Sequence, residues 1–299
     1  MAKRYSDRVR ALIIGCGYVG EALGQRLIAL DHEVTGIRRS SQHNNRLAKL
    51  GIRPLNLDIT QEREFEKLDT HYNQVVIAVS PGRGGNEAYQ KVFDLGVNHI
   101  TKWLQRNAHT SVVFISSTSV YRQKNAEWVQ EDIADIPENI TSKILWEAEQ
   151  KISTIEQAVT ILRSSGIYGP GRSHLFRQFM DGNATIEGNG DRYLNMVHRD
   201  DLAVAITHSI TNKDKLCGTF IITDDEPVKQ LAFFKWLSEI TNRPMPVFGP
   251  EPDPTTRKRG ITNKRVSNKL FKEILGFQYN YPTFREGLIE QLENWKAMP

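Results

Sequence analysis

The sequence has 299 residues, of which 39% are hydrophobic and 25% charged, with a formal net charge of +4. This composition is ordinary for a soluble globular protein and excludes a disordered chain, and no apolar run approaches the roughly 20 residues of a membrane span. Its two cysteines, Cys16 and Cys217, form no C-x-x-C pair and no Cys/His zinc spacing. We therefore expect a reduced, cytoplasmic protein without a bound metal.

The start of the chain superficially imitates a signal peptide, because basic residues precede an apolar run. Two glycines interrupt that run, however, and it leads into a strand, helix and strand pattern. We therefore expect no export.

Short β-rich apolar runs alternate with longer amphipathic segments over the first two-thirds of the chain. Six strands are predicted, at residues 10–15, 33–38, 52–57, 74–79, 111–116 and 159–164. The longest helical patterns run from Glu87 to Asn107 and from Ser142 to Glu156. This alternation predicts an α/β fold of the Rossmann type, a doubly wound parallel sheet with helices on both faces.

The pattern loosens after about Tyr168, where Gly and Pro clusters separate shorter elements. We predict an NAD(P)-binding Rossmann domain over residues 1–168. A smaller C-terminal substrate lobe follows over residues 169–299, with a segment at about 195–223 that returns to the Rossmann core.

A glycine motif follows the first predicted strand and opens an amphipathic helix. Gly15, Gly17 and Gly20 form the pattern G-x-G-x-x-G in that context. The first glycine permits the turn, the second lets a pyrophosphate approach the backbone, and the third lets the helix pack on the strand. The predicted cofactor-binding set also includes Tyr18, Val19, Val79 and Ser80.

The end of the second strand favours NADP(H) over NAD(H). An NAD-specific protein carries an acid there to bind the ribose hydroxyls, but this chain has no acid between Glu33 and Asp58. Arg38, Arg39 and Ser40 instead offer donors suited to a ribose 2′-phosphate. Solvated arginines in a loop are the alternative interpretation.

Several further stretches, in the right order along most of the chain, resemble the extended short-chain dehydrogenase/reductases, the NAD-dependent epimerase/dehydratase group. They are VFISSTSVY (113–121), ILRSSGIYGPGR (161–172), NMVHRDDLAVAI (195–206), TDDEPV (223–228) and RVSNKLFKEILGF (265–277). The resemblance implies a nucleotide-sugar-like substrate, and it implies that Asp58 lies beside the adenine. The plain glycine motif lacks the family's usual extra-glycine spacing and looks like the atypical members.

The family's catalytic Tyr-x-x-x-Lys pair is absent, since no tyrosine in the chain is followed four residues later by lysine. An alignment anchored on Lys143 places Asn139 at the tyrosine position. A gapless alignment, which we prefer, places Thr141 at the tyrosine position and Leu145 at the lysine position. Neither an amide nor an aliphatic hydroxyl can replace a tunable phenol, so the standard mechanism should not apply.

The candidate catalytic residues are Ser117, Thr141, Lys143 and Tyr121. The resemblance implies that Ser117 orients the substrate oxygen. Each of the others has a structural alternative, since Tyr121 could simply pack and Lys143 could be a surface residue. Other groups considered as a substitute acid or base are His198, Tyr168 and Glu131, for which a structural role is the more common one.

Two classes of function remain open at this point. One is an atypical NAD(P)-dependent oxidoreductase or epimerase acting on a small nucleotide-linked sugar or other carbonyl or alcohol, with Arg259 and Arg265 holding a diphosphate. The other is a non-catalytic NADP(H)-binding sensor or scaffold. The basic run from Arg257 to Arg265 is short, so we expect no nucleic-acid or membrane partner. The resemblance also implies a homodimer formed through the two long helices.

Overall fold

The computed structural model describes residues 8–69, 71–82, 84–106, 111–132, 135–212, 216–251 and 261–296. By its internal contacts the chain divides into two compact units. Unit 1 comprises residues 1–120, 136–163 and 202–220, and unit 2 comprises residues 121–135, 164–201 and 221–299.

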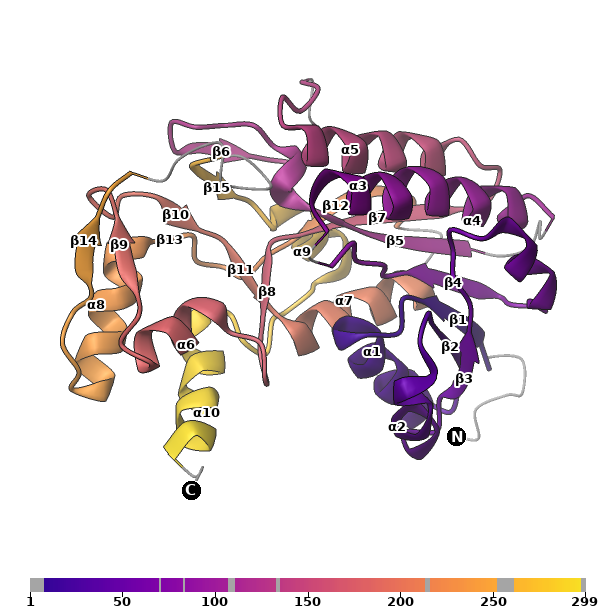
Figure 1. The fold of residues 1–299 in the computed structure, drawn as a ribbon, viewed down its shortest axis with the longest axis horizontal. Coiled ribbons are helices and arrows are strands. Elements are labelled where there is room, and N and C mark those ends of the chain that lie inside the picture. Colours follow the sequence, from indigo (N-terminus) through magenta and orange to yellow (C-terminus); the bar gives the residue numbers. More distant parts are fainter. Residues whose placement is uncertain are drawn as a thin grey trace. The chain divides into compact units, whose positions relative to one another are not determined.

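A seven-stranded sheet forms the centre of unit 1, in the order β12-β7-β5-β4-β1-β2-β3 (Figure 1). Its strands are β1 (Arg10–Ile14), β2 (Glu33–Arg38), β3 (Arg53–Asn56), β4 (Gln74–Ile77), β5 (Ser111–Ser117), β7 (Val159–Ser164) and β12 (Gly218–Ile222). The pairs β1–β2, β1–β4, β2–β3 and β4–β5 are parallel. The predicted Rossmann-type sheet is confirmed, and β12 adds an edge strand that was not among the predicted ones.

The sheet is hydrophobic along whole strands because both of its faces are covered. Residues 11–14 of β1 and residues 75–77 of β4 are completely buried. These two adjacent strands mark the point where the strand order reverses. In open α/β sheets, ligands bind in the crevice at the carboxyl ends of the strands at such a point.

Helices cover both faces of this sheet (Figure 1), with α1, α2 and α7 on one face and α3, α4 and α5 on the other. Their bounds are α1 (Tyr18–Ala29), α2 (Asn44–Lys49), α3 (Gly85–Tyr89), α4 (Val97–Leu104), α5 (Ile140–Ser153) and α7 (Arg199–Thr211). A π-helical stretch, η4 (Gln90–Gly96), joins α3 to α4. Short 3-10 turns are η2 (Ser41–His43), η3 (Glu62–Lys67) and η5 (Thr118–Val120). Within the described parts of the chain, no helix has the length and apolar character needed to span a membrane.

In its described residues, unit 2 is built from short strands in pairs and from helices. Its strands are β6 (Glu127–Val129), β8 (Gly166–Tyr168), β9 (Thr185–Glu187), β10 (Tyr193–Leu194), β11 (Met196–His198), β13 (Val228–Lys229), β14 (Val247–Gly249) and β15 (Lys264–Val266). The helices are α6 (His174–Met180), α8 (Gln230–Thr241), α9 (Lys269–Leu275) and α10 (Phe284–Lys296). Aromatic side chains such as Phe176, Phe233, Phe234 and Phe284 fill its core.

The two units differ in extent from the predicted domains. Residues 121–135, predicted within the Rossmann domain, belong to unit 2 because β6 pairs in parallel with β15. The segment that returns to unit 1 is 202–220, which lies inside the predicted range of 195–223.

Candidate functional site

The glycine-rich loop after β1 lies directly against the end of β4. Gly15 has a φ of +90°, and a Cβ atom there would lie 2.6 Å from the carbonyl oxygen of Ala78. A Cβ atom on Gly20 would lie 2.9 Å from the carbonyl oxygen of Gly15 and 3.0 Å from Cγ2 of Ile13. Both glycines are therefore needed for the turn and for the packing of α1 on the sheet.

Gly17 is different, because the fold does not need a glycine there to avoid a clash. The nearest atom to a Cβ at this position is the carbonyl oxygen of Gly15, at 4.0 Å. Gly17 is the N-cap of α1, whose end has no side-chain cap, while Tyr18 is half-buried and Val19 buried. The N–H groups of a first helical turn have no partner within the helix, so this open position suits an anion.

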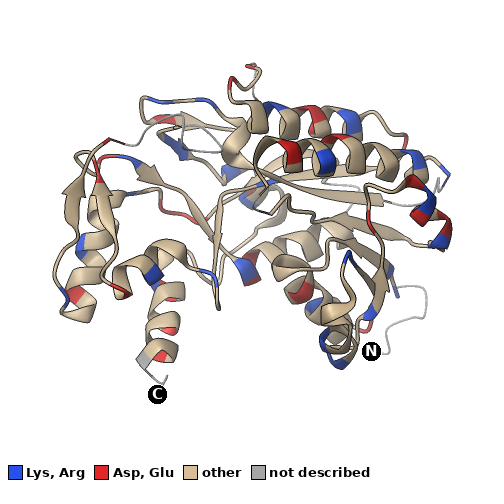
Figure 2. Cartoon of the chain, viewed as in Figure 1, with Lys and Arg blue, Asp and Glu red and all other residues tan. Residues whose placement is uncertain are grey.

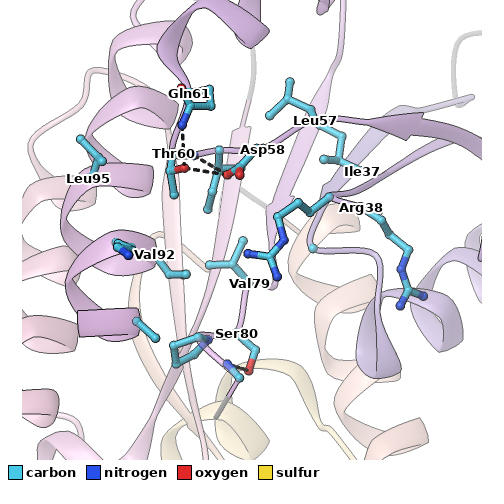
Figure 3. Close-up of a pocket in the computed structure, with 17 residues that line it drawn as sticks. Ile37, Arg38, Leu57, Asp58, Thr60, Gln61, Val79, Ser80, Val92 and Leu95 are labelled. Atoms are coloured by element: carbon cyan, nitrogen blue, oxygen red, sulfur yellow. Dashed lines mark hydrogen bonds between the residues drawn. The ribbon is translucent and has the colours of Figure 1, made fainter. Parts of the chain in front are cut away.

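A cavity of about 620 Å³ opens beside this loop (Figure 3). Its walls come from the loop after β1, the ends of β2 and β4, the segment after β3, and η4. The predicted cofactor residues that line it are Gly15, Arg38, Arg39, Asp58, Val79 and Ser80. The cavity falls within the size range of small-molecule sites, roughly 300–1,000 Å³.

Arg38, the last residue of β2, lines the cavity but is already paired. Its Nη1 donates to Oε1 of Glu21 at 2.8 Å. Glu21 lies in the first turn of α1, and its Oε2 accepts from Nε of Arg46 at 2.7 Å. One carboxylate thus binds two arginines. The sequence alone could not single out Glu21, because the pairing joins residues from three elements.

Arg39 and Ser40 follow Arg38 and are both exposed. Within the described ranges, Arg39 has no ion-pair partner although it lines the cavity. The Ser40 hydroxyl accepts the N–H of Gln42 at 3.3 Å and so caps η2. Lys91 of η4 also lines the cavity and was not singled out from the sequence, where it is one lysine on an amphipathic helix.

Asp58 lies on the cavity wall with one carboxylate oxygen in use. Its Oδ1 accepts from the backbone N–H of Thr60 at 3.0 Å and from the Thr60 hydroxyl at 2.8 Å, a contact drawn in Figure 3. Its own N–H donates to Oε2 of Glu64 at 2.6 Å. These bonds fix the carboxylate and leave Oδ2 without a hydrogen bond among the described residues.

The serine strand β5 ends in two serines with different roles. Ser116 donates to Oε1 of Glu149, which is completely buried and forms an ion pair with Arg163, whose Nη2 lies 2.7 Å from Oε2. This network joins β5, α5 and β7. Ser117 accepts the N–H of Ser119 at 3.2 Å through its hydroxyl oxygen. Ser117 is half-buried.

Helix α5 carries the residues that align with the family's missing pair. Thr141 and Leu145 are buried, whereas Lys143 is exposed and faces Glu147, with 4.0 Å between Nζ and Oε1. The Thr141 hydroxyl donates to Oδ1 of Asn139, the residue that caps the helix. The two residues that the gapless alignment places at the tyrosine and lysine positions, Thr141 and Leu145, therefore lie on the buried face of α5. Lys143 lies away from that face.

Tyr121, in unit 2, has a fully buried side chain. Its carbonyl oxygen accepts from Nζ of Lys264 at 2.9 Å, and the hydroxyl of Thr262 lies at the same distance from that nitrogen. Burial, with a smaller contribution from Arg192, lowers the pKa of Lys264 to about 7. No sequence pattern marked this buried lysine.

The other residues considered as an acid or base have structural partners in unit 2. The His198 ring is buried against the Tyr168 and Tyr281 rings, and burial lowers the pKa of His198. Tyr168 donates its hydroxyl to the carbonyl of Thr283 at 3.2 Å, and burial raises its pKa. Glu131 accepts the N–H of Ile221 at 3.1 Å.

The basic run is only partly described, because Arg257 and Arg259 lie outside the described residues. Arg265 lies on β15 with its guanidinium group over two rings, 5.1 Å from the centroid of Trp128 and 5.6 Å from that of Tyr193. Its Nε donates to the carbonyl of Ala126 at 2.9 Å. The guanidinium is thereby held in one orientation.

Comparisons with known proteins place this chain in a family. The model of the NAD dependent epimerase/dehydratase family matches residues 11–221, whereas a search of curated proteins finds no match. A structure from Methylobacillus flagellatus, described as that of a putative NAD-dependent epimerase/dehydratase, is 29% identical, with a TM-score of 0.80 over 97% of this chain and 99% of the other.

Two structures with bound ligands share the fold at lower identity. MoeE5 in complex with UDP-glucose and NAD is 20% identical, with a TM-score of 0.78 over 96% of this chain and 98% of the other. UDP-glucuronic acid 4-epimerase from Bacillus cereus, in complex with UDP-glucuronic acid and NAD, is 19% identical, with a TM-score of 0.77 over 96% of this chain and 99% of the other. The family match covers most of the chain and includes the glycine-rich loop, the serine strand and α5, so this protein belongs to the NAD-dependent epimerase/dehydratase family.

Proposed function

We propose that this protein binds NADP(H) in preference to NAD(H) and acts on a nucleotide-sugar-like or other carbonyl or alcohol substrate by a non-standard mechanism. The observation that carries the proposal is the open position over Gly17, beside a cavity lined by Asp58 and Arg39. A dinucleotide needs an anion site, an adenine site and a ribose site close together, and these three residues are suited to them.

The residues of unit 1 fit a nicotinamide dinucleotide. The N-terminal turn of α1 would hold the pyrophosphate, and the free Oδ2 of Asp58 would accept from the adenine amino group. Arg39 would bind a ribose 2′-phosphate, while Val79 and Ser80 would line the path beyond the pyrophosphate. When bound, the dinucleotide supplies a hydride donor or acceptor.

Proton transfer in this protein must proceed without the tyrosine of the family's Tyr-x-x-x-Lys pair. Ser117 would hold the substrate oxygen, as the family resemblance implies. The Thr141 hydroxyl is a much weaker acid than a phenol and is bonded to Asn139, while Lys143 is exposed. Loss of a general acid or base typically slows a reaction by about 10² to 10⁴, so we expect slow turnover.

The position of Arg265 supports the proposal that the substrate contains a diphosphate. Its guanidinium lies over the rings of Trp128 and Tyr193, and neither Nη atom has a hydrogen-bond partner within the described residues. An oriented arginine can bind a phosphate through two parallel hydrogen bonds. UDP-glucose and UDP-glucuronic acid, found in the complexes of MoeE5 and the Bacillus cereus epimerase, are therefore the first substrates to test.

Gly17→Ala tests the cofactor site. The new methyl group meets no atom closer than 4.0 Å, so the fold should persist while the pyrophosphate position is filled. We expect at least a tenfold loss of NADPH affinity, measured by quenching of tryptophan fluorescence, with an unchanged circular dichroism spectrum. An unchanged NADPH affinity in the variant would show that the pyrophosphate does not bind at this loop. If the wild type bound neither NADPH nor NADH, the proposal would be overturned.

The second candidate function is a non-catalytic NADP(H) sensor or scaffold. The observation that favours it is α5, where the hydroxyl of the buried Thr141 is bonded to the capping residue Asn139 and Lys143 faces Glu147. Steady-state assays with NADPH and NADP⁺ across a sugar-nucleotide panel separate the two functions. Turnover at any substrate favours the enzyme. A sensor requires different affinities for the two redox forms, because equal affinity shifts no population.

A homodimer in the cytoplasm completes the proposal. The exposed sides of η4 and α5 carry the ion pair between Lys151 and Asp94, 2.9 Å apart, and positive and negative residues alternate along these helices (Figure 2). Leu95 and Ile140 add exposed apolar area. Light scattering during size-exclusion chromatography should give twice the chain mass, and a single-chain mass would contradict the dimer.

A further inference from the structure

The ion pair between Glu21 and Arg38 changes the charge that the cavity offers to a ligand. Arg38 is the arginine closest to the end of β2, with a side chain that is 23% exposed, and Glu21 is 13% exposed. Because both groups are largely removed from solvent, their interaction is screened less than that of a surface pair. Glu21 also lies in the first turn of α1, where a negative charge is favoured by the helix dipole. Both interactions hold the carboxylate in place.

The neighbouring arginines are not equivalent to Arg38. Arg46 donates to the other oxygen of Glu21 at 2.7 Å, but its side chain is 69% exposed. Arg39 lines the cavity and is exposed, with no acidic partner in the described part of the chain. The carboxylate of Glu21 therefore neutralises Arg38, which is more buried than Arg46. Arg39 stays available for a ligand.

A ribose 2′-phosphate carries close to two negative charges at neutral pH, as other phosphate monoesters do. At the end of β2 it would compete with Glu21 for Arg38 and would be repelled by the carboxylate itself. A ribose with a free 2′-hydroxyl carries no charge, so neither the competition for Arg38 nor the repulsion by Glu21 affects it. Glu21 thus acts against the phosphorylated cofactor alone.

We propose that Glu21 is a specificity-determining residue, which neutralises Arg38 and leaves Arg39 as the arginine that binds the 2′-phosphate. The inference rests on the proposed binding of a nicotinamide dinucleotide in this cavity. It predicts that the wild-type protein accepts both NADPH and NADH, with a preference for NADPH that is smaller than two free arginines would give.

The test is Glu21→Gln in the full chain, with dissociation constants for NADPH and NADH from tryptophan fluorescence. The substitution keeps the shape of the side chain and removes its charge. We expect NADPH to bind about five- to tenfold more tightly, as removal of one like charge near the phosphate implies, while the NADH affinity stays within about twofold. Retained NADH binding also shows that the variant is folded.

Three further variants make the result specific. Glu33→Gln removes the same charge at the opposite end of β2, where Glu33 pairs with Arg8 and Arg10, and should leave both affinities unchanged. Arg39→Gln should weaken NADPH at least tenfold without affecting NADH. In an Arg38→Gln background, Glu21→Gln should have a smaller effect than in the wild type, because the two residues act as a pair.

The outcomes separate this inference from the proposed function. If the wild type binds a dinucleotide but Glu21→Gln leaves the NADPH affinity unchanged, the inference is overturned and the cofactor site stands. Weaker NADPH binding in Glu21→Gln would mean that the carboxylate orients Arg38 toward the phosphate, which also overturns it. If the wild type binds neither nucleotide, both fall.

Discussion

Lys264 has its ammonium group in the interior of unit 2, where the residue is only 5% exposed. Its described hydrogen bonds go to a carbonyl and a hydroxyl oxygen and not to a carboxylate. Burial disfavours the charged form, which is why the pKa falls from 10.5 to about 7. This residue should therefore change charge near neutral pH.

The protonation of Lys264 makes stability depend on pH. Between about pH 7 and 10.5 the unfolded chain holds a proton that the native state has lost, so the free energy of unfolding should rise with pH by about 1 kcal/mol per unit. Below pH 7 both states are protonated and the native state bears the full desolvation cost. Urea unfolding of the wild type from pH 7 to 9 should give this slope, and Lys264→Met should lack it.

Lys143→Met is the matched control, because that lysine is exposed on α5. It should keep the wild-type slope. The pH range stops at 9 because burial raises the pKa of Cys16 to about 12, and this contribution cancels the rise with pH once the unfolded thiol ionises. A flat wild-type profile would show that Lys264 keeps its ordinary pKa.

Only some of the residues with a particular role could be predicted from the sequence. Gly15, Gly17 and Gly20 could be predicted because each meets a local requirement of the turn between a strand and a helix. Glu21 and Lys264 could not, since their properties depend on residues distant in sequence. Glu21 is paired by Arg38 and Arg46, and Lys264 acquires its low pKa from burial in the tertiary structure.

Helix α5 is tied to two strands of the sheet by one buried group of residues. Glu149 on α5 bonds to Arg163 on β7 and to Ser116 on β5, and neither member of the ion pair is appreciably exposed. Removal of one partner leaves the other charge buried and uncompensated. The position of α5 should therefore depend strongly on this pair.

We expect Glu149→Gln to lower the free energy of unfolding by about 3–5 kcal/mol, the usual effect of breaking a buried ion pair. Glu147→Gln, two residues earlier on the same helix and 53% exposed, should change it by less than about 0.5 kcal/mol. Denaturant titration of both variants checks the prediction. Similar small losses in the two variants would contradict it.

The sequence predicted the elements with strong periodicity and missed those that depend on partners. The six predicted strands are present because continuous apolar runs are characteristic of a covered parallel sheet. The strand β6 was missed, since its three residues are stabilised by pairing with β15. The π-helical η4 was predicted only as ordinary helix, and its geometry is not encoded in the apolar pattern.

For the whole molecule, binding of a dinucleotide should raise thermal stability. A ligand that binds only the native state at 100 times its dissociation constant adds about 2.7 kcal/mol to the free energy of unfolding. We expect NADPH to raise the melting temperature, measured by differential scanning calorimetry. Gly17→Ala, in which we expect at least tenfold weaker binding, should gain no more than about half of this free energy at the same concentration, and so show a smaller rise. A rise of equal size in that variant would place NADPH elsewhere on the protein.

The passage of the chain back and forth between the two units has a consequence for biosynthesis. Unit 2 takes residues 121–135 from the middle of the chain and pairs them with β15, through the register Lys264↔Glu127. During translation, β6 leaves the ribosome long before its partner has been made. An unpaired strand edge readily associates with other chains. A nascent chain that stalls before Lys264 should therefore need a chaperone, and the completed chain should not.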